Sequence, residues 1–211
     1  MASYRQGEAD KLPLDDASFD VFRCQTELMD LAQPLDALHE MLRILRPGGL
    51  VVCVEPNNLW NYLGFTSLTE NETVECLVRR FEFSLRQHRG RAAAGRGNHS
   101  ISDLLPGYFA GLGLHDITVH QNDRPAPLFP PYAGPAQKVL VEQERQWNNS
   151  SIGPWNREDL RQLFLCGGGD ASSSESAFAD AVEKYHREQQ AIADGHFHAS
   201  GGSLNYLVSA R

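Results

Sequence analysis

Polar side chains stand at points of this sequence where a strand would end. Glu55 ends the apolar run 50–55, "LVVCVE", and Asn57 and Asn58 follow it closely. Gln25 ends an earlier run of strand length. In open α/β sheets, ligands collect at the carboxyl ends of the strands. We therefore predict that these side chains lie on one rim of a sheet, where they could face a bound molecule. Alternatively, Gln25 could simply cap its strand, and the two asparagines could form a turn.

Two histidines near the carboxyl end raise the question of a metal site. His196 and His198 alternate with Phe197 just before the last apolar run, so both imidazoles could share one face of a strand. A structural or catalytic zinc needs at least three protein ligands. No third ligand with suitable spacing is evident in the sequence, so we predict no metal site.

A basic stretch and a proline-rich loop each leave two interpretations open. Six arginines stand between positions 79 and 96, against the single glutamate Glu82. They could bind an anionic acceptor or partner, or they could be a solvated helix face and loop. The six arginines are Arg79, Arg80, Arg86, Arg89, Arg91 and Arg96.

Tyr132, in "PPY", could line an acceptor pocket or be buried in a rigid loop.

The first quarter of the chain has the pattern of a strand, a helix and a second strand. Residues 19–24 form a short predicted strand, and 34–46 place apolar residues at the three-to-four spacing of a helix. "PGG" at 47–49 is predicted to end that helix. The run 50–55 is continuously apolar, as expected of a strand buried on both faces. Together these segments predict a right-handed crossover between parallel strands.

Further elements follow with weaker patterns. We predict a helix over 102–113 that Pro106 interrupts, and strands over 114–121 and 203–210. Asn156 and Ser172 resemble the first residues of capping boxes. Between them, "CGGGDASSS" is predicted to be a flexible linker. The remaining predicted helices cover 74–85, 135–147, 157–165 and 175–193.

Composition limits the class of protein. The chain has 211 residues, of which 41% are apolar and 22% charged, as in globular domains. Its formal net charge of −8 argues against general nucleic-acid binding. No apolar run reaches the length of a membrane span, and the start lacks the apolar stretch of a signal peptide. The four cysteines form no C-x-x-C pair, so we predict reduced thiols in a cytoplasmic protein.

Two stretches resemble class I S-adenosylmethionine-dependent methyltransferases. They are "GEADKLPLDDASFDVFRCQ" and "ALHEMLRILRPGGLVVCVEP", and "LPGYFAGLGLHDITV" matches more weakly. The resemblance implies that S-adenosyl-L-methionine is the cofactor. By analogy, the Glu8 carboxylate accepts from the adenine amino group, and Ala9 offers its N–H to the ring. Cys24 and Gln25 would border the methionine part, while Glu55 and the two asparagines would face the substrate.

The resemblance also implies a fold. We expect an α/β protein with an incomplete Rossmann-like methyltransferase sheet and helical insertions that form a lid. The core would comprise residues 1–55, 101–121 and 196–211. The insertions would be 56–100, a helical segment, and 122–195, the helical lid.

The family places a strand, a G-x-G loop, a helix and another strand before the first matching stretch. The six residues before Gly7 hold none of these, and the glycines of 167–169 follow a predicted helix rather than a strand. We therefore expect an N-terminally truncated chain. The strand at 19–24 would then be an exposed apolar edge, through which we hypothesise that the chain forms a homodimer or aggregates.

These features leave two functions open. The first is a methyltransferase that acts on a small-molecule acceptor. This chain could be inactive as it stands, because the glycine-rich loop is missing. The alternative is a non-catalytic remnant that serves as an interaction module. A nicotinamide-dependent oxidoreductase would need G-x-G-x-x-G after a strand, which the sequence lacks.

Overall fold

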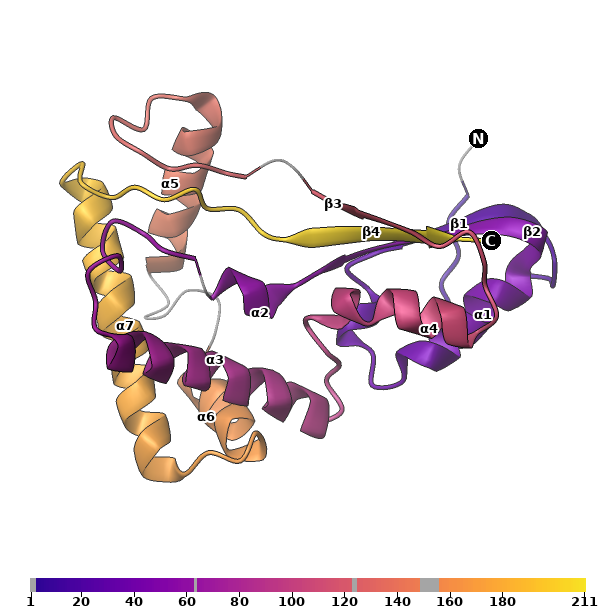
Figure 1. Cartoon of the computed structure of the whole chain (residues 1–211), viewed down its shortest axis with the longest axis horizontal. Coiled ribbons are helices and arrows are strands. Elements are labelled where there is room, and N and C mark those ends of the chain that lie inside the picture. Colours follow the sequence, from indigo (N-terminus) through magenta and orange to yellow (C-terminus); the bar gives the residue numbers. More distant parts are fainter. Residues whose placement is uncertain (1–2, 63, 123–124, 149–155) are drawn as a thin grey trace. The chain divides into compact units, whose positions relative to one another are not determined.

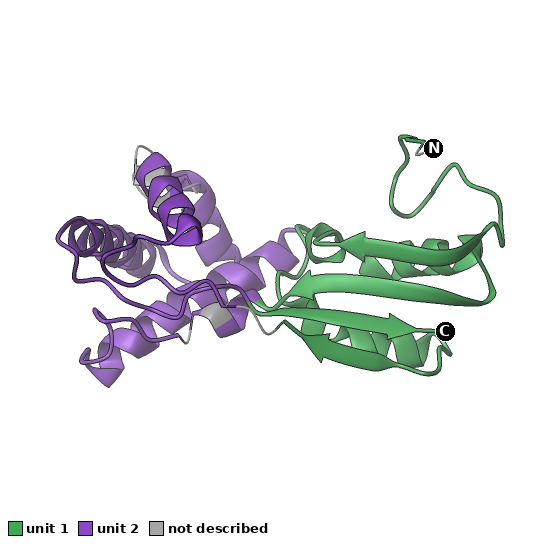
Figure 2. Ribbon diagram, turned by 90° about the horizontal axis from the view of Figure 1, so that it is seen from above, with its two compact units in different colours: residues 1–57, 95–122, 204–211 green, residues 58–94, 123–203 purple. Residues whose placement is uncertain are grey.

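The computed structural model describes residues 3–62, 64–122, 125–148 and 156–211. The chain divides into two compact units, shown in Figure 2. Unit 1 consists of residues 1–57, 95–122 and 204–211, and unit 2 of residues 58–94 and 123–203. Residues 196–203, which the sequence analysis placed in the core, therefore belong to unit 2. The predicted lid remains a prediction.

Unit 1 is built on a four-stranded mixed sheet with the order β1-β2-β4-β3. β1 and β2 are parallel, and β4 runs antiparallel to both of its neighbours, as the arrows of unit 1 in Figure 2 show. The predicted α/β class is confirmed. The strands are β1 (Phe19–Gln25), β2 (Leu45–Pro56), β3 (Thr118–Gln121) and β4 (Asn205–Ala210).

Helix α1 (Pro34–Ile44) connects the two parallel strands. Pro34 lies in its first turn, where the missing N–H costs nothing. The buried side chains of the helix are Ala37, Leu38, Met41 and Ile44, at the predicted helical spacing. The crossover unit predicted from the sequence is therefore present.

The junction between α1 and β2 differs from the prediction. The helix ends at Ile44 and Leu45 is already extended, two residues before Pro47. Leu45 pairs with Phe19, and the next register pair joins Val21 to Leu50. The intervening residues are thus an irregularity within the strand. Strand pairing ends the helix before "PGG" is reached.

The core of unit 1 lies on one face of the sheet. Helices α1 and α4 (Leu105–Gly111) both cover this face (Figure 1). Because side chains alternate along a strand, residues between the buried ones point to the opposite face. There Val21 is 56% exposed and Leu207 is 38% exposed. The buried residues include Val51, Cys53, Val208 and Ala210 from the sheet, and Leu38, Met41, Leu105 and Phe109 from the helices.

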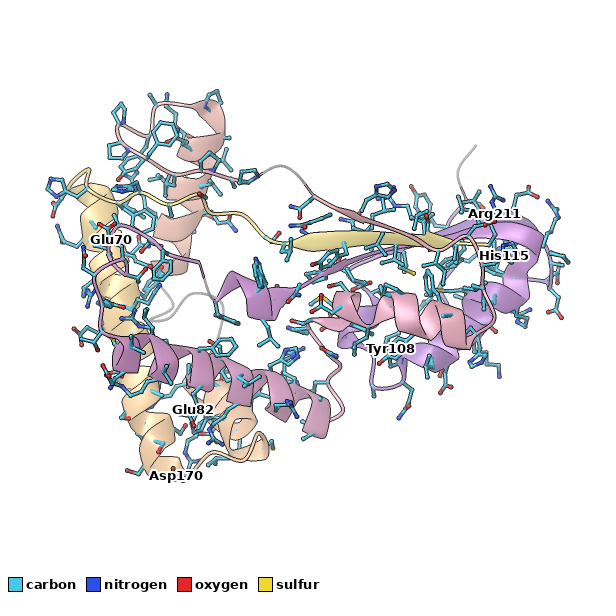
Figure 3. The ribbon with its side chains drawn as sticks, viewed as in Figure 1. Glu70, Glu82, Tyr108, His115, Asp170 and Arg211 are labelled. Atoms are coloured by element: carbon cyan, nitrogen blue, oxygen red, sulfur yellow. The ribbon has the colours of Figure 1, made fainter. Side chains whose placement is uncertain are left out.

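The segment before β3 also corrects two expectations. Pro106 does not interrupt a helix, because a 3₁₀ helix, η2 (Ile101–Asp103), precedes α4 and Pro106 lies in the first turn of α4. β3 begins only at Thr118. At its entrance, Arg211 and His115 exchange backbone hydrogen bonds of 2.8 and 2.9 Å, and Figure 3 shows the two residues side by side.

Unit 2 consists of helices, of which α3 and α6 pack closely. A Cβ atom at Gly90 of α3 would lie 1.7 Å from the carbonyl oxygen of Leu163 in α6. This approach of two backbones is open only to glycine. The rings of Phe83 and Phe164 lie 5.6 Å apart at the same contact. The helices are α2 (Asn58–Asn61), α3 (Val74–Ala93), α5 (Pro135–Asn148), α6 (Arg157–Cys166) and α7 (Ala171–Ala193).

The glycine-rich link between α6 and α7 is packed, and the expectation of a flexible linker is wrong. A Cβ atom at Gly167 would lie 1.9 Å from the carbonyl oxygen of Arg86. The N-cap of α7 is Asp170, whose carboxylate accepts from the Ser173 N–H at 2.9 Å. Figure 3 labels Asp170 at the start of α7. Ser172, predicted to begin a capping box, instead lies inside the helix.

The start of α6 is as predicted. The side chain of Asn156 accepts from the Asp159 N–H at 2.6 Å. Among the described helices, none combines the length and the apolar character that a membrane span needs.

Candidate functional site

The carboxyl ends of β1 and β2 form the rim that the sequence predicted. Cys24 is the register partner of Cys53, and Gln25 is the partner of Val54. Because the two strands are parallel, Gln25 and Glu55 end at the same edge of the sheet. The shared rim is confirmed, and the positions of its side chains decide what it could bind.

Glu55 is fully buried at this rim. Its Oε1 atom accepts from the N–H groups of Glu27 and Leu28, both at 3.0 Å. Its Oε2 atom accepts from the Met29 N–H at 3.3 Å. These donors lie at the start of η1 (Leu28–Asp30), which has no side-chain N-cap of its own. Glu55 therefore satisfies the N-terminal donors of η1 from a neighbouring strand.

Burial shapes the ionisation of Glu55. Desolvation raises the pKa of its carboxyl group, and the three N–H donors only partly oppose this rise. A buried carboxylate with these partners presents no oxygen to a ligand. The structure thus gives no support to the predicted contact between Glu55 and the substrate.

The two asparagines after β2 have different surroundings. Asn57 is buried; its Nδ2 donates to Asp103 Oδ2 at 2.6 Å, and its backbone N–H donates to the Leu204 carbonyl at 2.8 Å. Asn58 is half-buried and begins α2, in unit 2. Asn57 thus joins three segments of unit 1, which favours a structural role.

Gln25 and Cys24 remain the best-placed candidates on the rim. Gln25 is exposed, and its Oε1 accepts from Arg23 Nη2 at 2.8 Å. Cys24 is half-buried, and its Sγ atom lies 3.4 Å from Cys53 Sγ. Sequence reasoning missed Cys53, because only the register of the two strands shows that the cysteines are neighbours.

Glu8 and Ala9 lie in a turn closed by the Lys11 N–H, which donates to the Glu8 carbonyl at 3.0 Å. Glu8 is exposed, and Ala9 packs against the core of unit 1. The chain then contacts α1, where the Leu12 N–H donates to Glu40 Oε1 at 2.7 Å. The hydrogen bond from Arg43 is the main reason why the pKa of Glu40 falls to about 2. An ionised anchor on α1 therefore holds the segment that carries Glu8.

Tyr132 is held by a loop. Its hydroxyl donates to the Phe197 carbonyl at 2.9 Å and accepts from the Phe197 N–H at 3.1 Å. Burial raises the pKa of the Tyr132 phenol. The ring also borders an open hollow of about 620 Å³ lined by Arg145 and His186, among others. The paired hydroxyl favours the rigid-loop interpretation of Tyr132.

Several arginines of the basic stretch have partners inside unit 2. Arg80 forms an ion pair with Glu72, to which Arg187 of α7 also donates at 3.0 Å. These hydrogen bonds outweigh desolvation and lower the pKa of Glu72. Arg86 pairs with Glu82 at 2.6 Å. Such pairs favour a structural role for this part of the stretch over an anion site.

Metal ligands do not gather in the part of the chain that the structure describes. Within those residues, no group of three or more histidine, cysteine, aspartate or glutamate side chains could hold a metal ion.

Comparisons with known proteins agree with the resemblance. Residues 2–53 match the family model described as a methyltransferase domain. A demethylmenaquinone methyltransferase of Staphylococcus epidermidis is 49% identical over 49 residues, which are 23% of this chain and 20% of that protein. An uncharacterized methyltransferase of Schizosaccharomyces pombe is 40% identical over 57 residues, 27% of this chain and 20% of that protein. The chain thus spans about a fifth of the length of the curated relatives it matches.

Solved structures of methyltransferases also align with most of this chain. One proposed methyltransferase, from an antibiotic biosynthesis pathway of Anabaena variabilis, has 16% sequence identity and a TM-score of 0.44. The match covers 98% of this chain and 72% of that one. A likeness at this level carries no argument about function.

The segment that holds β1, α1 and most of β2 is therefore similar to a methyltransferase domain. The resemblance predicted from its two motifs is confirmed over those residues.

Proposed function

We propose that this chain belongs to an S-adenosylmethionine-dependent methyltransferase that acts on a small-molecule acceptor. The observation that carries the proposal is the match of residues 2–53 to a methyltransferase domain, together with the parallel pair β1 and β2. The cofactor would supply an electrophilic methyl group, and the protein would contribute alignment and exclusion of water.

The residues present suit a cofactor at the rim of unit 1. Gln25 is an exposed amide at the end of β1, and Glu8 is an exposed carboxylate in the segment before it. An amide can bond the amino-acid part of the cofactor, and a carboxylate can accept from an adenine amino group. Glu55 would act indirectly, by holding the turn from Glu27 to Met29 beside the rim.

A small-molecule acceptor is supported by two observations. One relative is a demethylmenaquinone methyltransferase, whose name gives a small quinone as its acceptor. Unit 2 holds an open hollow of about 410 Å³, whose lining includes the exposed rings of Phe65 and Phe129. This volume lies within the usual range of small-molecule sites. We propose an acceptor with an apolar ring or chain.

Calorimetric titration of S-adenosylmethionine into the purified chain tests the proposal. We expect saturable binding below millimolar cofactor, weakened about tenfold or more by Gln25→Ala and by Glu8→Ala, which corresponds to about 1.4 kcal/mol or more in each case. Glu183→Gln, an exposed change on α7, is the matched control and should leave the affinity unchanged. An absence of binding at millimolar cofactor would contradict the proposal.

One observation favours an interaction module as the second candidate. β1 lies at the edge of the described sheet, with Phe19 40% and Val21 56% exposed. An edge strand offers unpaired backbone groups for another strand. We propose a second copy of the chain as the partner, paired through β1.

Light scattering coupled to size exclusion tests the second candidate. The pairing predicts the mass of a dimer, which Val21→Lys should reduce to that of a monomer. Val139→Lys, at an exposed apolar position on α5, is the control and should leave the dimer intact. A monomeric parent chain at high concentration would contradict pairing through β1.

A further inference from the structure

Cys24 and Cys53 are neighbours across the parallel pair of unit 1. They occupy opposite positions in the register of β1 and β2. Both side chains point to the helix-covered face, because Cys53 belongs to the buried core and Cys24 packs against it. The two sulfur atoms lie 3.4 Å apart.

The backbone geometry suits a bond between these sulfurs. Adjacent strands lie about 4.8 Å apart, and Cα atoms joined by a disulfide are usually separated by about 4.4 to 6.8 Å. Because the side chains already point the same way, side-chain rotation can close the gap to the bonding distance of about 2.0 Å. Little movement of the strands is needed.

The two thiols differ in access. Cys53 has no exposed surface, whereas Cys24 is partly exposed. The hydrogen bond with Cys24 and the burial of the site both raise the pKa of the Cys53 thiol well above its usual range. Because Cys24 is the accessible sulfur of the pair, it is the one that meets an oxidant first.

We propose that Cys24 and Cys53 form an oxidisable dithiol, a modification site that hydrogen peroxide converts into a disulfide between β1 and β2. In the first step the Cys24 thiolate attacks peroxide, so an S–O bond forms, the O–O bond breaks and hydroxide leaves as water after protonation. The Cys53 sulfur then attacks Cys24, so the S–S bond forms, the S–O bond breaks and a second water leaves. Two thiols lose two electrons, and one peroxide becomes two waters.

The experiment uses the full chain with Cys76→Ser and Cys166→Ser, so that Cys24 and Cys53 are the only thiols that can react. Both changed cysteines belong to unit 2, whereas Cys24 and Cys53 belong to unit 1. The folded chain is treated with hydrogen peroxide, blocked with an alkylating reagent and weighed intact. Trypsin would release Cys24 in peptide 24–43 and Cys53 in peptide 44–79, since Pro47 protects Arg46 from cleavage.

The proposal predicts that the two free thiols fall to none, with a mass loss of two hydrogen atoms in a monomer. It also predicts that the two peptides become linked and that dithiothreitol separates them. Adding Cys53→Ser should abolish the link and leave Cys24 oxidised to sulfenic or higher acids. If a variant fails to fold, the peroxide-treated parent chain is used, and because its peptide 44–79 carries both Cys53 and Cys76, fragmentation of the linked peptides must place the bond at Cys53.

Two outcomes would overturn the proposal. One is a folded chain in which both thiols remain alkylatable after peroxide. The other is oxidation of Cys24 to sulfinic acid while Cys53 stays a free thiol. These readouts are masses of the chain and its peptides, so they do not depend on methyl transfer or on cofactor binding.

Discussion

Glu55 Oε1 accepts a hydrogen bond of 3.0 Å from the backbone N–H of Leu28, and both residues are fully buried. The carboxylate thereby connects the end of β2 to the turn that follows β1. The same side chain also binds the N–H groups of Glu27 and Met29. The predicted ligand-binding rim is thus held in place by a residue that the sequence presented as a ligand.

Removal of the Glu55 carboxylate should loosen the η1 turn. Glu55→Ala leaves buried N–H groups without partners, which costs about 1–3 kcal/mol. Glu55→Gln keeps one acceptor oxygen and should cost less. Hydrogen–deuterium exchange of a peptide covering residues 26–32 measures the effect, with exchange fastest in the alanine variant. Unchanged protection in Glu55→Ala would show that the three hydrogen bonds do not hold the turn.

The raised pKa of Glu55 predicts a pH dependence of the stability of unit 1. Its usual value is 4.5, and burial raises the folded-state value above this. Protonation therefore favours the folded state, so the contribution of Glu55 is fully present below pH 4.5 and is lost as the pH rises through the folded-state pKa. In urea titrations followed by hydrogen exchange of β2, the parent chain should lose stability relative to Glu55→Gln across this window. A difference that stays constant with pH would contradict the assignment.

Gly90→Ala should destabilise unit 2, because a Cβ atom there would lie 1.7 Å from the Leu163 carbonyl oxygen. Separation of α3 and α6 to relieve such a clash costs about 1–3 kcal/mol. Gly107→Ala in α4 is the matched control, since a Cβ atom at this helical position has no neighbour within 4 Å. Urea unfolding followed by circular dichroism should show a lower free energy of unfolding for Gly90→Ala and an unchanged or higher one for Gly107→Ala.

The N-cap of α7 is Asp170 in the structure, whereas the sequence pattern predicted Ser172. Asp170→Ala removes the acceptor of the Ser173 N–H and should lower the urea midpoint of unit 2. Ser172→Ala changes an exposed helical residue and should leave the midpoint nearly unchanged. Hydrogen bonds with Ser173 are the main reason why the pKa of Asp170 is lowered. The difference in urea midpoint between the parent chain and Asp170→Ala should therefore shrink as the pH falls through that pKa. Equal midpoints for both variants would contradict a stabilising N-cap at Asp170.

Local patterns were enough to predict β1, α1 and β2 in their order. Helical spacing over 34–46 and the apolar run 50–55 are properties of short windows, and both elements are present. The end of α1 was missed because Leu45 pairs with Phe19, a contact that spans the whole crossover. A turn signal such as "PGG" does not reveal this pairing.

The candidate site could be predicted only in outline. The shared rim follows from two parallel strands, so Gln25 and Glu55 were correctly placed at one edge. The burial of Glu55 depends on N–H donors at 27–29, far away in the sequence. The link at 167–169 was misjudged for a related reason, since Gly167 approaches Arg86 of α3 closely and Gly169 approaches Phe164 of α6.

A nuclear magnetic resonance titration with S-adenosylhomocysteine shows, residue by residue, where the cofactor binds. A cofactor site at the end of β1 predicts saturable shifts of the backbone amides of Cys24 and Gln25 and of the turn from Glu27 to Met29, which Glu55 holds. No shift at these amides with millimolar ligand, or shifts confined to unit 2, would contradict a cofactor site at the end of β1.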